Sequence, residues 1–167
     1  KSIEISAEGV TLDLGGHTVT YNNVYQTELE GRDWPEWIAD AHYGIRSVGP
    51  DNLKIFNGKI KPGLGNNSGH PGQSIGHNPI YLGSSGNVEI AGISIEYWAA
   101  QMVGIFLRYS NGGHIHNNVM LDRGYELTNR HGTGSKAVQL ISNSDSTIHM
   151  HNNLVKRTRQ SGLLGGE

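Results

Sequence analysis

The chain contains no cysteine, which excludes disulfide scaffolds, thiolate metal sites and cysteine nucleophiles. It also lacks a strong charge of one sign, because 13 Lys and Arg stand against 15 Asp and Glu and the net charge is -2. That balance excludes a protein that binds nucleic acid or a membrane surface through bulk positive charge. The longest apolar run, from Met102 to Leu107, is far shorter than the ~18 residues of a transmembrane helix. We therefore expect neither nucleic acid nor a membrane span.

Glycine is the residue type in excess. The 24 glycines among 167 residues are roughly twice the ~7% share of an average protein. So much glycine indicates many tight turns and few long helices. The length suits one domain with a core of its own, so we treat residues 1–167 as a single domain.

An internal repeat relates five segments of the chain. In each segment an apolar anchor is followed two positions later by Gly or Asn, and five positions later by another apolar residue. Because Gly and Asn tolerate left-handed backbone angles, the middle column predicts a bend between two short strands. The anchors are Leu14, Ile55, Ile90, Ile115 and Met150; the bend column is Gly16, Asn57, Gly92, Asn117 and Asn152; the third column is Val19, Ile60, Ile95, Met120 and Val155.

A further apolar column precedes the anchors and predicts a third strand in each unit. Strands that stack on their own copies bury a continuous core, with ~4.8 Å between neighbours. The pairs Asn117-Asn118 and Asn152-Asn153 would then lie one above the other, and their amides would hydrogen-bond along the stack. The members of the column are Ile45, Ile80, Ile105 and Val138, and Leu163 begins one more unit.

At these residues the chain resembles a known family. The segments LDLGGHTV (12–19), NVEIAGISI (87–95), IHNNV (115–119) and MHNNL (150–154) resemble coils of the right-handed parallel β-helix of the pectin-lyase-like superfamily. The resemblance covers nearly the whole chain and implies an all-β solenoid of about five coils. Since the chain starts at Lys1 and stops at Glu167 within the pattern, we expect a processed chain or a fragment of a longer one.

In this superfamily, loops called T3 lead into a sheet called PB1 and form the walls of a groove above it. The T3-type loops are expected near 20–43, 61–78 and 121–136, where most of the length variation falls. Strand alternation points one residue of each PB1 strand outward, into the groove. Aromatic rings suit the C–H faces of sugars and Arg suits carboxylates, so these residues are candidates for substrate binding. They are Arg46, Tyr81, Phe106 and Gln139. Alternatively, the T3 loops fold over the sheet and cover the aromatic rings.

Two loops add candidate residues. Trp34 and Trp37 fall within four consecutive residues and are flanked by carboxylates, as in a sugar subsite. Alternatively, they anchor the first loop to the body of the protein. Arg130 belongs to a locally basic group in the fourth and fifth loops. That group matches an acidic polysaccharide better than a neutral one, although a plain charged rim explains it as well.

The lyases of this superfamily cleave uronate chains by β-elimination. The reaction needs the substrate carboxylate neutralised, by Ca²⁺ or by a basic side chain, and a base within reach. The resemblance makes Arg108, His131 and Lys136 candidates for these catalytic roles, and it suggests Ca²⁺ as a cofactor. A glycosidase of the same fold would need a close carboxylate pair, and Glu126 belongs to the pool of acidic residues that would supply it.

Four histidines occupy matching positions one coil apart: His114, His116, His149 and His151. Because Ile115 and Met150 between them point inward, all four imidazoles are expected on the outer surface. Such an array is chemically able to bind Zn²⁺ or Cu²⁺. A flat sheet is poorly shaped for a tetrahedral site, so we predict no native metal site.

The sequence thus favours a secreted or cell-surface β-helix that binds an acidic polysaccharide and cleaves it by β-elimination or hydrolysis. The alternative is a non-catalytic structural or adhesive protein, such as a spike, a stalk or a filament subunit. The sequence shows no amphipathic capping helix, and an uncapped solenoid exposes strand edges that favour head-to-tail self-association. Truncation of a longer enzyme explains the same feature.

Overall fold

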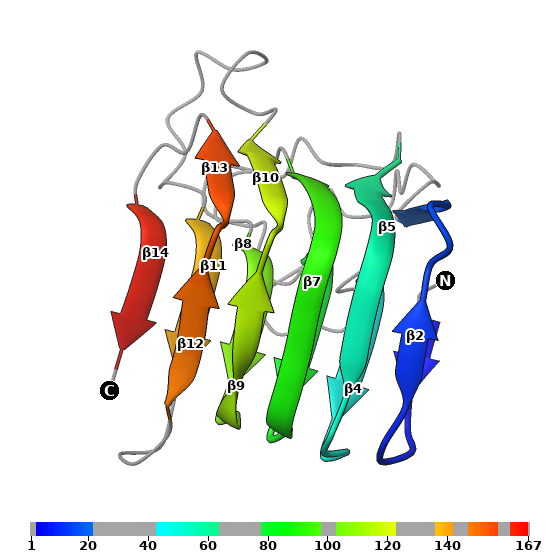
Figure 1. Ribbon diagram of the computed structural model, residues 1–167, viewed down its shortest axis with the longest axis vertical. Coiled ribbons are helices and arrows are strands. Elements are labelled where there is room, and N and C mark those ends of the chain that lie inside the picture. The colour runs from blue at the N-terminus through cyan, green and yellow to red at the C-terminus, as the bar shows by residue number, and fades with distance from the viewer. Residues whose placement is uncertain are drawn as a thin grey trace, which may run out of the picture.

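The computed structural model describes residues 3–21, 43–63, 78–97, 103–122, 136–141, 147–156 and 161–166, the last range as backbone only (Figure 1). These residues form β-strands joined by turns, and they contain no helix. All strand pairs among them are parallel. The protein is therefore all-β, with parallel sheets. The loops expected near 20–43, 61–78 and 121–136 lie almost entirely outside the described ranges.

One sheet, called sheet A, has six strands in chain order. Strands that are neighbours in this sheet are never consecutive in sequence, because the chain visits the other sheet between them. The strands are β1 (Ile3–Ile5), β4 (Ile45–Val48), β6 (Ile80–Gly83), β8 (Val103–Arg108), β11 (Lys136–Ile141) and β14 (Ser161–Gly166).

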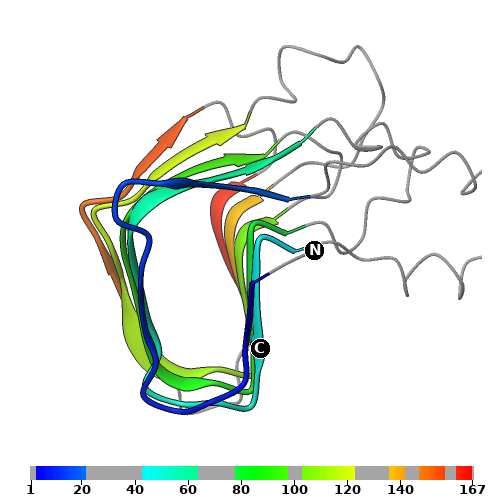
Figure 2. The same ribbon diagram turned by 90° about the vertical axis from the view of Figure 1, so that its right-hand side faces the viewer.

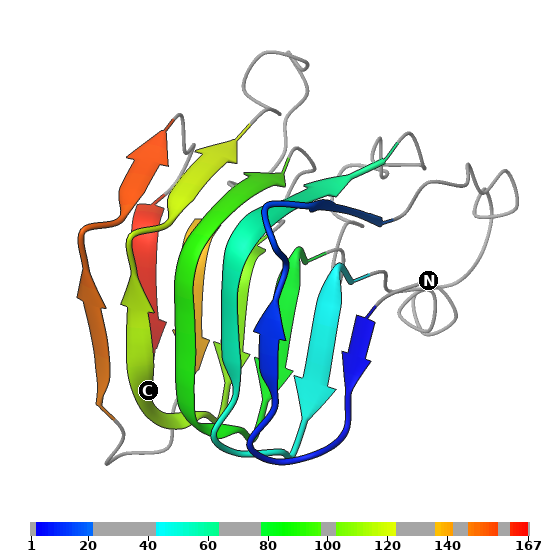
Figure 3. The same ribbon diagram turned by 45° about the vertical axis from the view of Figure 1, so that its right-hand side comes forward.

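The second sheet, called sheet B, has eight strands and a bend along its middle (Figures 2 and 3). Two long strands run through the bend, and each pairs with shorter strands on either side of it. The long strands are β5 (Lys54–Pro62) and β7 (Gly86–Tyr97); the short ones are β2 (Thr11–Asp13), β3 (Thr18–Tyr21), β9 (Asn111–His116), β10 (Val119–Asp122), β12 (Ile148–His151) and β13 (Leu154–Lys156).

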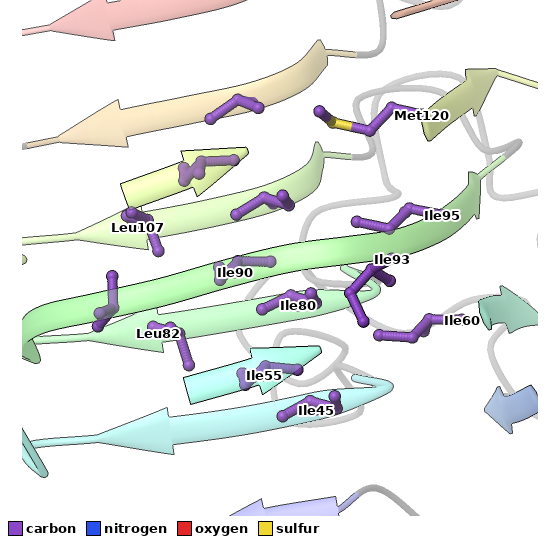
Figure 4. Packing of buried hydrophobic residues seen from close by; sticks show 14 of the residues in the cluster. Ile45, Ile55, Ile60, Ile80, Leu82, Ile90, Ile93, Ile95, Leu107 and Met120 are labelled. Atoms are coloured by element: carbon purple, nitrogen blue, oxygen red, sulfur yellow. The ribbon is translucent and has the colours of Figure 1, made fainter. Parts of the chain in front are cut away.

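The predicted apolar columns are confirmed by the strand registers. In sheet A, Ile45, Ile80, Ile105, Val138 and Leu163 are successive Cα partners. In sheet B, one column runs through Ile55, Ile90, Ile115 and Met150, and another through Val19, Ile60, Ile95, Met120 and Val155. The columns of the two sheets face each other and form one continuous core (Figure 4). Burial of these side chains is the main force that joins the sheets.

The predicted register of the first anchor, Leu14, is wrong by two residues. Leu12, not Leu14, is the Cα partner of Ile55, whereas Val19 is back in register with Ile60. The first bend is two residues longer than the others and forms a turn in which His17 N donates to Leu14 O (2.8 Å). Leu14 is still buried, because its side chain fills the space that the missing side chain of Gly58 leaves. A Cβ on Gly58 would lie 2.4 Å from the Leu14 Cβ.

The bend column adopts the left-handed backbone that the sequence predicts. The φ angles are 77° at Gly16, 61° at Asn57, 63° at Gly92, 56° at Asn117 and 54° at Asn152. Two further left-handed columns, in the turns that lead from sheet A to sheet B, were missed. One contains Asn52 and Asn87, the other Ser84 and Tyr109. Ser and Tyr are rare in this conformation, so the second of these columns carried no signal in the sequence.

The predicted stacking of asparagines is confirmed. Asn118 Nδ2 donates to Asn153 Oδ1 (3.0 Å) and to the Ile90 carbonyl (2.9 Å), while Asn118 Oδ1 accepts from Ile93 N (2.9 Å). Asn153 Nδ2 in turn donates to the carbonyl of Ile115 (2.7 Å). The buried Asn118 amide thus joins the bends of three successive units.

No helix in the described part of the chain is long and apolar enough to cross a membrane.

We expect Asn118→Ala to lower the free energy of unfolding by about 2–4 kcal/mol, because it removes the acceptor of the buried Ile93 N–H and the hydrogen bonds from Asn118 Nδ2 to Ile90 and Asn153. Urea unfolding followed by circular dichroism measures the change. Asn111→Ala, at an exposed position of β9, is the matched control and should change stability by less than about 0.5 kcal/mol. Equal effects of the two substitutions would contradict a structural role for the asparagine stack.

Candidate functional site

The outer surface of sheet A carries four of the predicted binding residues side by side. Arg46, Tyr81, Phe106 and Gln139 are Cα partners on successive strands, and each is half-buried. The first three lie between buried neighbours, and Gln139 follows the buried Val138. The predicted outward orientation is therefore confirmed. Together with Tyr43 and Arg108, described next, these residues make up what we call the sheet A face.

Three aromatic rings cross the sheet A face in sequence. The centroids of Tyr43 and Tyr81 lie 5.2 Å apart, and those of Tyr81 and Phe106 lie 5.4 Å apart in an edge-to-face arrangement. Edge-to-face contacts stabilise aromatic pairs beyond the area that they bury. Tyr43 precedes β4 and lies outside the alternating strand pattern, so no periodic signal in the sequence indicated it. The rings form a continuous aromatic row from the segment before β4 to β8.

The two arginines of this face differ in how their charge is balanced. Arg46 forms a salt bridge with Glu4, its Cα partner on β1, and its guanidinium lies 5.9 Å from the ring centroid of Tyr43. Arg108 has no carboxylate within salt-bridge distance among the described residues. Among the described residues, Arg108 is therefore the cation of this face that no carboxylate balances.

Two phenol groups lie beside Arg108. Its guanidinium lies 5.1 Å from the ring centroid of Tyr109, and side-chain hydrogen bonds to Tyr109 and Tyr81 raise the pKa of Arg108. The Tyr81 hydroxyl reaches Arg108 because the Tyr81 ring leans along β6 over Gly83, the Cα partner of Arg108. A Cβ on Gly83 would lie 3.2 Å from the Tyr81 hydroxyl. Gly83 thus leaves room for the ring that orients the arginine.

Burial raises the pKa of the Tyr43 phenol, and the nearby Tyr81 adds to the increase, while Arg46 and Arg108 oppose it. Tyr43 therefore stays a neutral hydrogen-bond donor at physiological pH. In the part of the chain that the structure describes, the face combines phenol hydroxyls and flat rings with the Arg108 guanidinium, which no described carboxylate pairs. That combination is suited to a ligand with carboxylates and apolar C–H surfaces.

The remaining catalytic candidates do not form one group with Arg108 in the described part of the chain. Lys136 is the Cα partner of Val103, five residues before Arg108 on the neighbouring strand, so the two Cα atoms are roughly 17 Å apart along the strands. The other predicted site residues, Trp34, Trp37, Glu126, Arg130 and His131, lie outside the described residues.

The four histidines lie on the outer surface of sheet B, as predicted, in two stacked pairs. The ring centroids of His114 and His149 are 5.1 Å apart, and those of His116 and His151 are 4.8 Å apart. His116 Nε2 lies 3.3 Å from Glu89, whose carboxylate also pairs with Lys54 (3.0 Å). We call the four imidazoles the histidine face.

The described residues hold no group of three or more His, Asp or Glu side chains arranged to bind a metal ion. They therefore do not fit the Ca²⁺ that the resemblance suggests. Comparison with protein-family models, with curated proteins and with solved structures found no match to this chain.

We expect Glu89→Gln to weaken the dependence of stability on acid. Hydrogen bonds from Lys54 and then from His116 lower the pKa of Glu89 in the folded protein. The carboxylate therefore stabilises the fold above the pKa of about 4.3 that it has in the unfolded chain. The contribution is lost as the pH falls through the lowered pKa of the folded state. Because Glu89 is partly exposed, it amounts to no more than about 1 kcal/mol.

Urea unfolding at a series of pH values between about 6 and 3 measures this effect. The unfolding free energy of Glu89→Gln should fall less steeply with acid than that of the wild type. Glu8→Gln, at an exposed turn position, is the control and should follow the wild-type curve. Coincident curves for wild type and Glu89→Gln would rule out a stabilising ion pair.

Proposed function

We propose that the two sheets are two sides of a right-handed parallel β-helix of the pectin-lyase-like type. The proposal is supported by the order of the strands, since each return to sheet A adds a strand directly beside the previous one. Crossover connections between parallel strands of one sheet are right-handed in about 98% of cases. The left-handed bend column and the asparagine stack support the same fold.

The sheet A face is, on this proposal, a binding site for an acidic polysaccharide. The observation that carries it is the Arg108 guanidinium, which no carboxylate among the described residues pairs and which lies beside two tyrosines at the end of a row of aromatic rings. A guanidinium pairs with a carboxylate through two parallel hydrogen bonds. The rings beside it offer flat apolar surfaces to the C–H faces of successive sugars. Uronate chains combine both features.

Cleavage by β-elimination is the reaction that this arrangement suits. Arg108 would neutralise a uronate carboxylate, which acidifies the proton on the adjacent carbon. A base would then remove that proton, and the bond to the leaving oxygen on the next carbon would break as the double bond forms. Among the described residues, the phenols of Tyr81 and Tyr109 are the titratable groups nearest to Arg108. We place this activity outside the cell or at its surface.

We expect Arg108→Gln to weaken binding to polygalacturonate by about tenfold or more, because a charge-assisted contact is lost. Arg46→Gln should weaken it by less than about threefold, since Glu4 already balances that charge. Arg108→Lys should be intermediate, because Lys keeps the charge but loses the bidentate geometry. Calorimetry or affinity electrophoresis measures the constants, with neutral dextran as the ligand control and Lys61→Gln, on sheet B, as the protein control.

The same samples test the reaction. Ultraviolet absorbance detects the unsaturated products of elimination, and a reducing-end assay detects hydrolysis. Binding without either product would make the protein a binding module. Absence of both binding and products, with fibres forming as concentration rises, would instead support the structural or adhesive alternative and head-to-tail association.

A further inference from the structure

The histidine face lies on the outer surface of sheet B and belongs to a different wall of the molecule from the sheet A face. His114, His149 and His151 are exposed, and the side chain of His116 is 20% exposed. The strands that carry them, β9 and β12, are paired in register, so His114 faces His149 and His116 faces His151. Four imidazoles therefore share one small and accessible surface.

Few charged groups surround these rings. On the neighbouring strand β7, Glu89 is the Cα partner of His114, and Ala91 is that of His116. One strand further, Lys54 and Phe56 continue the same two columns. On the other side, no strand among the described residues pairs with β12. Because Lys54 and Glu89 neutralise each other, these columns of described residues carry no net charge while their histidines are neutral.

Acid changes this balance. Imidazole is the side chain that ordinarily becomes charged between pH 8 and 5. Full protonation would put four positive charges on the face beside one carboxylate that already has a lysine partner. Like charges about 5 Å apart repel each other, and anions from solution relieve that repulsion. The stacked arrangement therefore favours anion binding at low pH and does not favour it at neutral pH.

A transition metal fits the geometry less well. Both ring nitrogens of His116 are in use, since Nδ1 lies 3.0 Å from Asn117 Nδ2 and Nε2 lies 3.3 Å from Glu89. The rings of His116 and His151 lie face to face, with 3° between their planes. Parallel stacked rings cannot direct their lone pairs at one ion between them.

We propose that the histidine face is a second ligand site, which binds the carboxylate or sulfate groups of an acidic polymer once its imidazoles are protonated. It acts at mildly acidic pH and does not involve the arginines of the sheet A face. Each bound oxyanion accepts charge-assisted hydrogen bonds from the imidazolium groups of His114, His149 and His151. His116, whose ring nitrogens already contact Glu89 and Asn117, contributes its positive charge. The site would increase retention on a polyanion as the surroundings acidify.

Binding of the full chain to polygalacturonate, dextran sulfate and neutral dextran at pH 7.5 and pH 5.0, at constant ionic strength, tests the proposal. We expect wild-type affinity for at least one polyanion to rise about tenfold at pH 5.0, with a steeper dependence on salt. Comparison of the two polyanions distinguishes carboxylate from sulfate as the preferred group. Neutral dextran should show no gain.

Four variants locate the effect. Substituting Gln at all four positions, or only His114→Gln with His149→Gln, should abolish or reduce the acid gain and leave binding at pH 7.5 unchanged. The double variant changes only exposed side chains, and circular dichroism at both pH values verifies folding. His17→Gln, in an exposed turn, is the matched control. Arg108→Gln should weaken binding at both pH values and keep the gain.

Each result has one meaning. An acid gain that survives the fourfold substitution, or that His17→Gln removes equally, would overturn the histidine proposal. No gain in the wild type would overturn it as well. Unchanged binding in Arg108→Gln would instead refute the proposed role of the sheet A face and leave this inference standing.

Discussion

The structure depends on strands that stack in strict parallel register, so that an inward side chain always lies on the inward side chain of the neighbouring strand. Every described strand takes part, and the two walls meet in a core of aliphatic columns. Because the period along a strand is two residues, a shift by one would turn a column of isoleucines to solvent. The same register lines up the outward residues, which is why arginine, tyrosine and phenylalanine gather on one sheet and histidines on the other.

Most of this arrangement could be predicted from the sequence. Few residue types occur in a buried column, and still fewer residue types adopt the left-handed backbone of the bends. That basis alone sufficed to predict the positions of Ile80, Ile105 and Val138. The register of Leu14 could not be predicted in this way, since a bend with two extra residues leaves the local pattern of apolar residues and glycine unchanged. Its true neighbour is visible only where the chain packs across to Gly58.

The site was less predictable than the fold. Alternation sufficed to point Arg46, Tyr81 and Phe106 outward, but it says nothing of how charges are balanced across strands. That Glu4 neutralises Arg46 and that Tyr81 lies against Arg108 follow from contacts between residues far apart in the chain. Tyr43 joins the aromatic row from outside any strand, and no periodic pattern indicates such a residue.

The lengthened first bend has a consequence for how proteins of this kind can change. Two additional residues are accommodated at the corner, and the chain resumes its register within a few positions, at Val19. Corners can therefore gain or lose length during evolution while the interior stays intact. The outward side chains can then change during evolution without altering the core. Selection for a ligand acts on these outward positions, whose spacing is set by the strands that the hydrophobic columns stabilise.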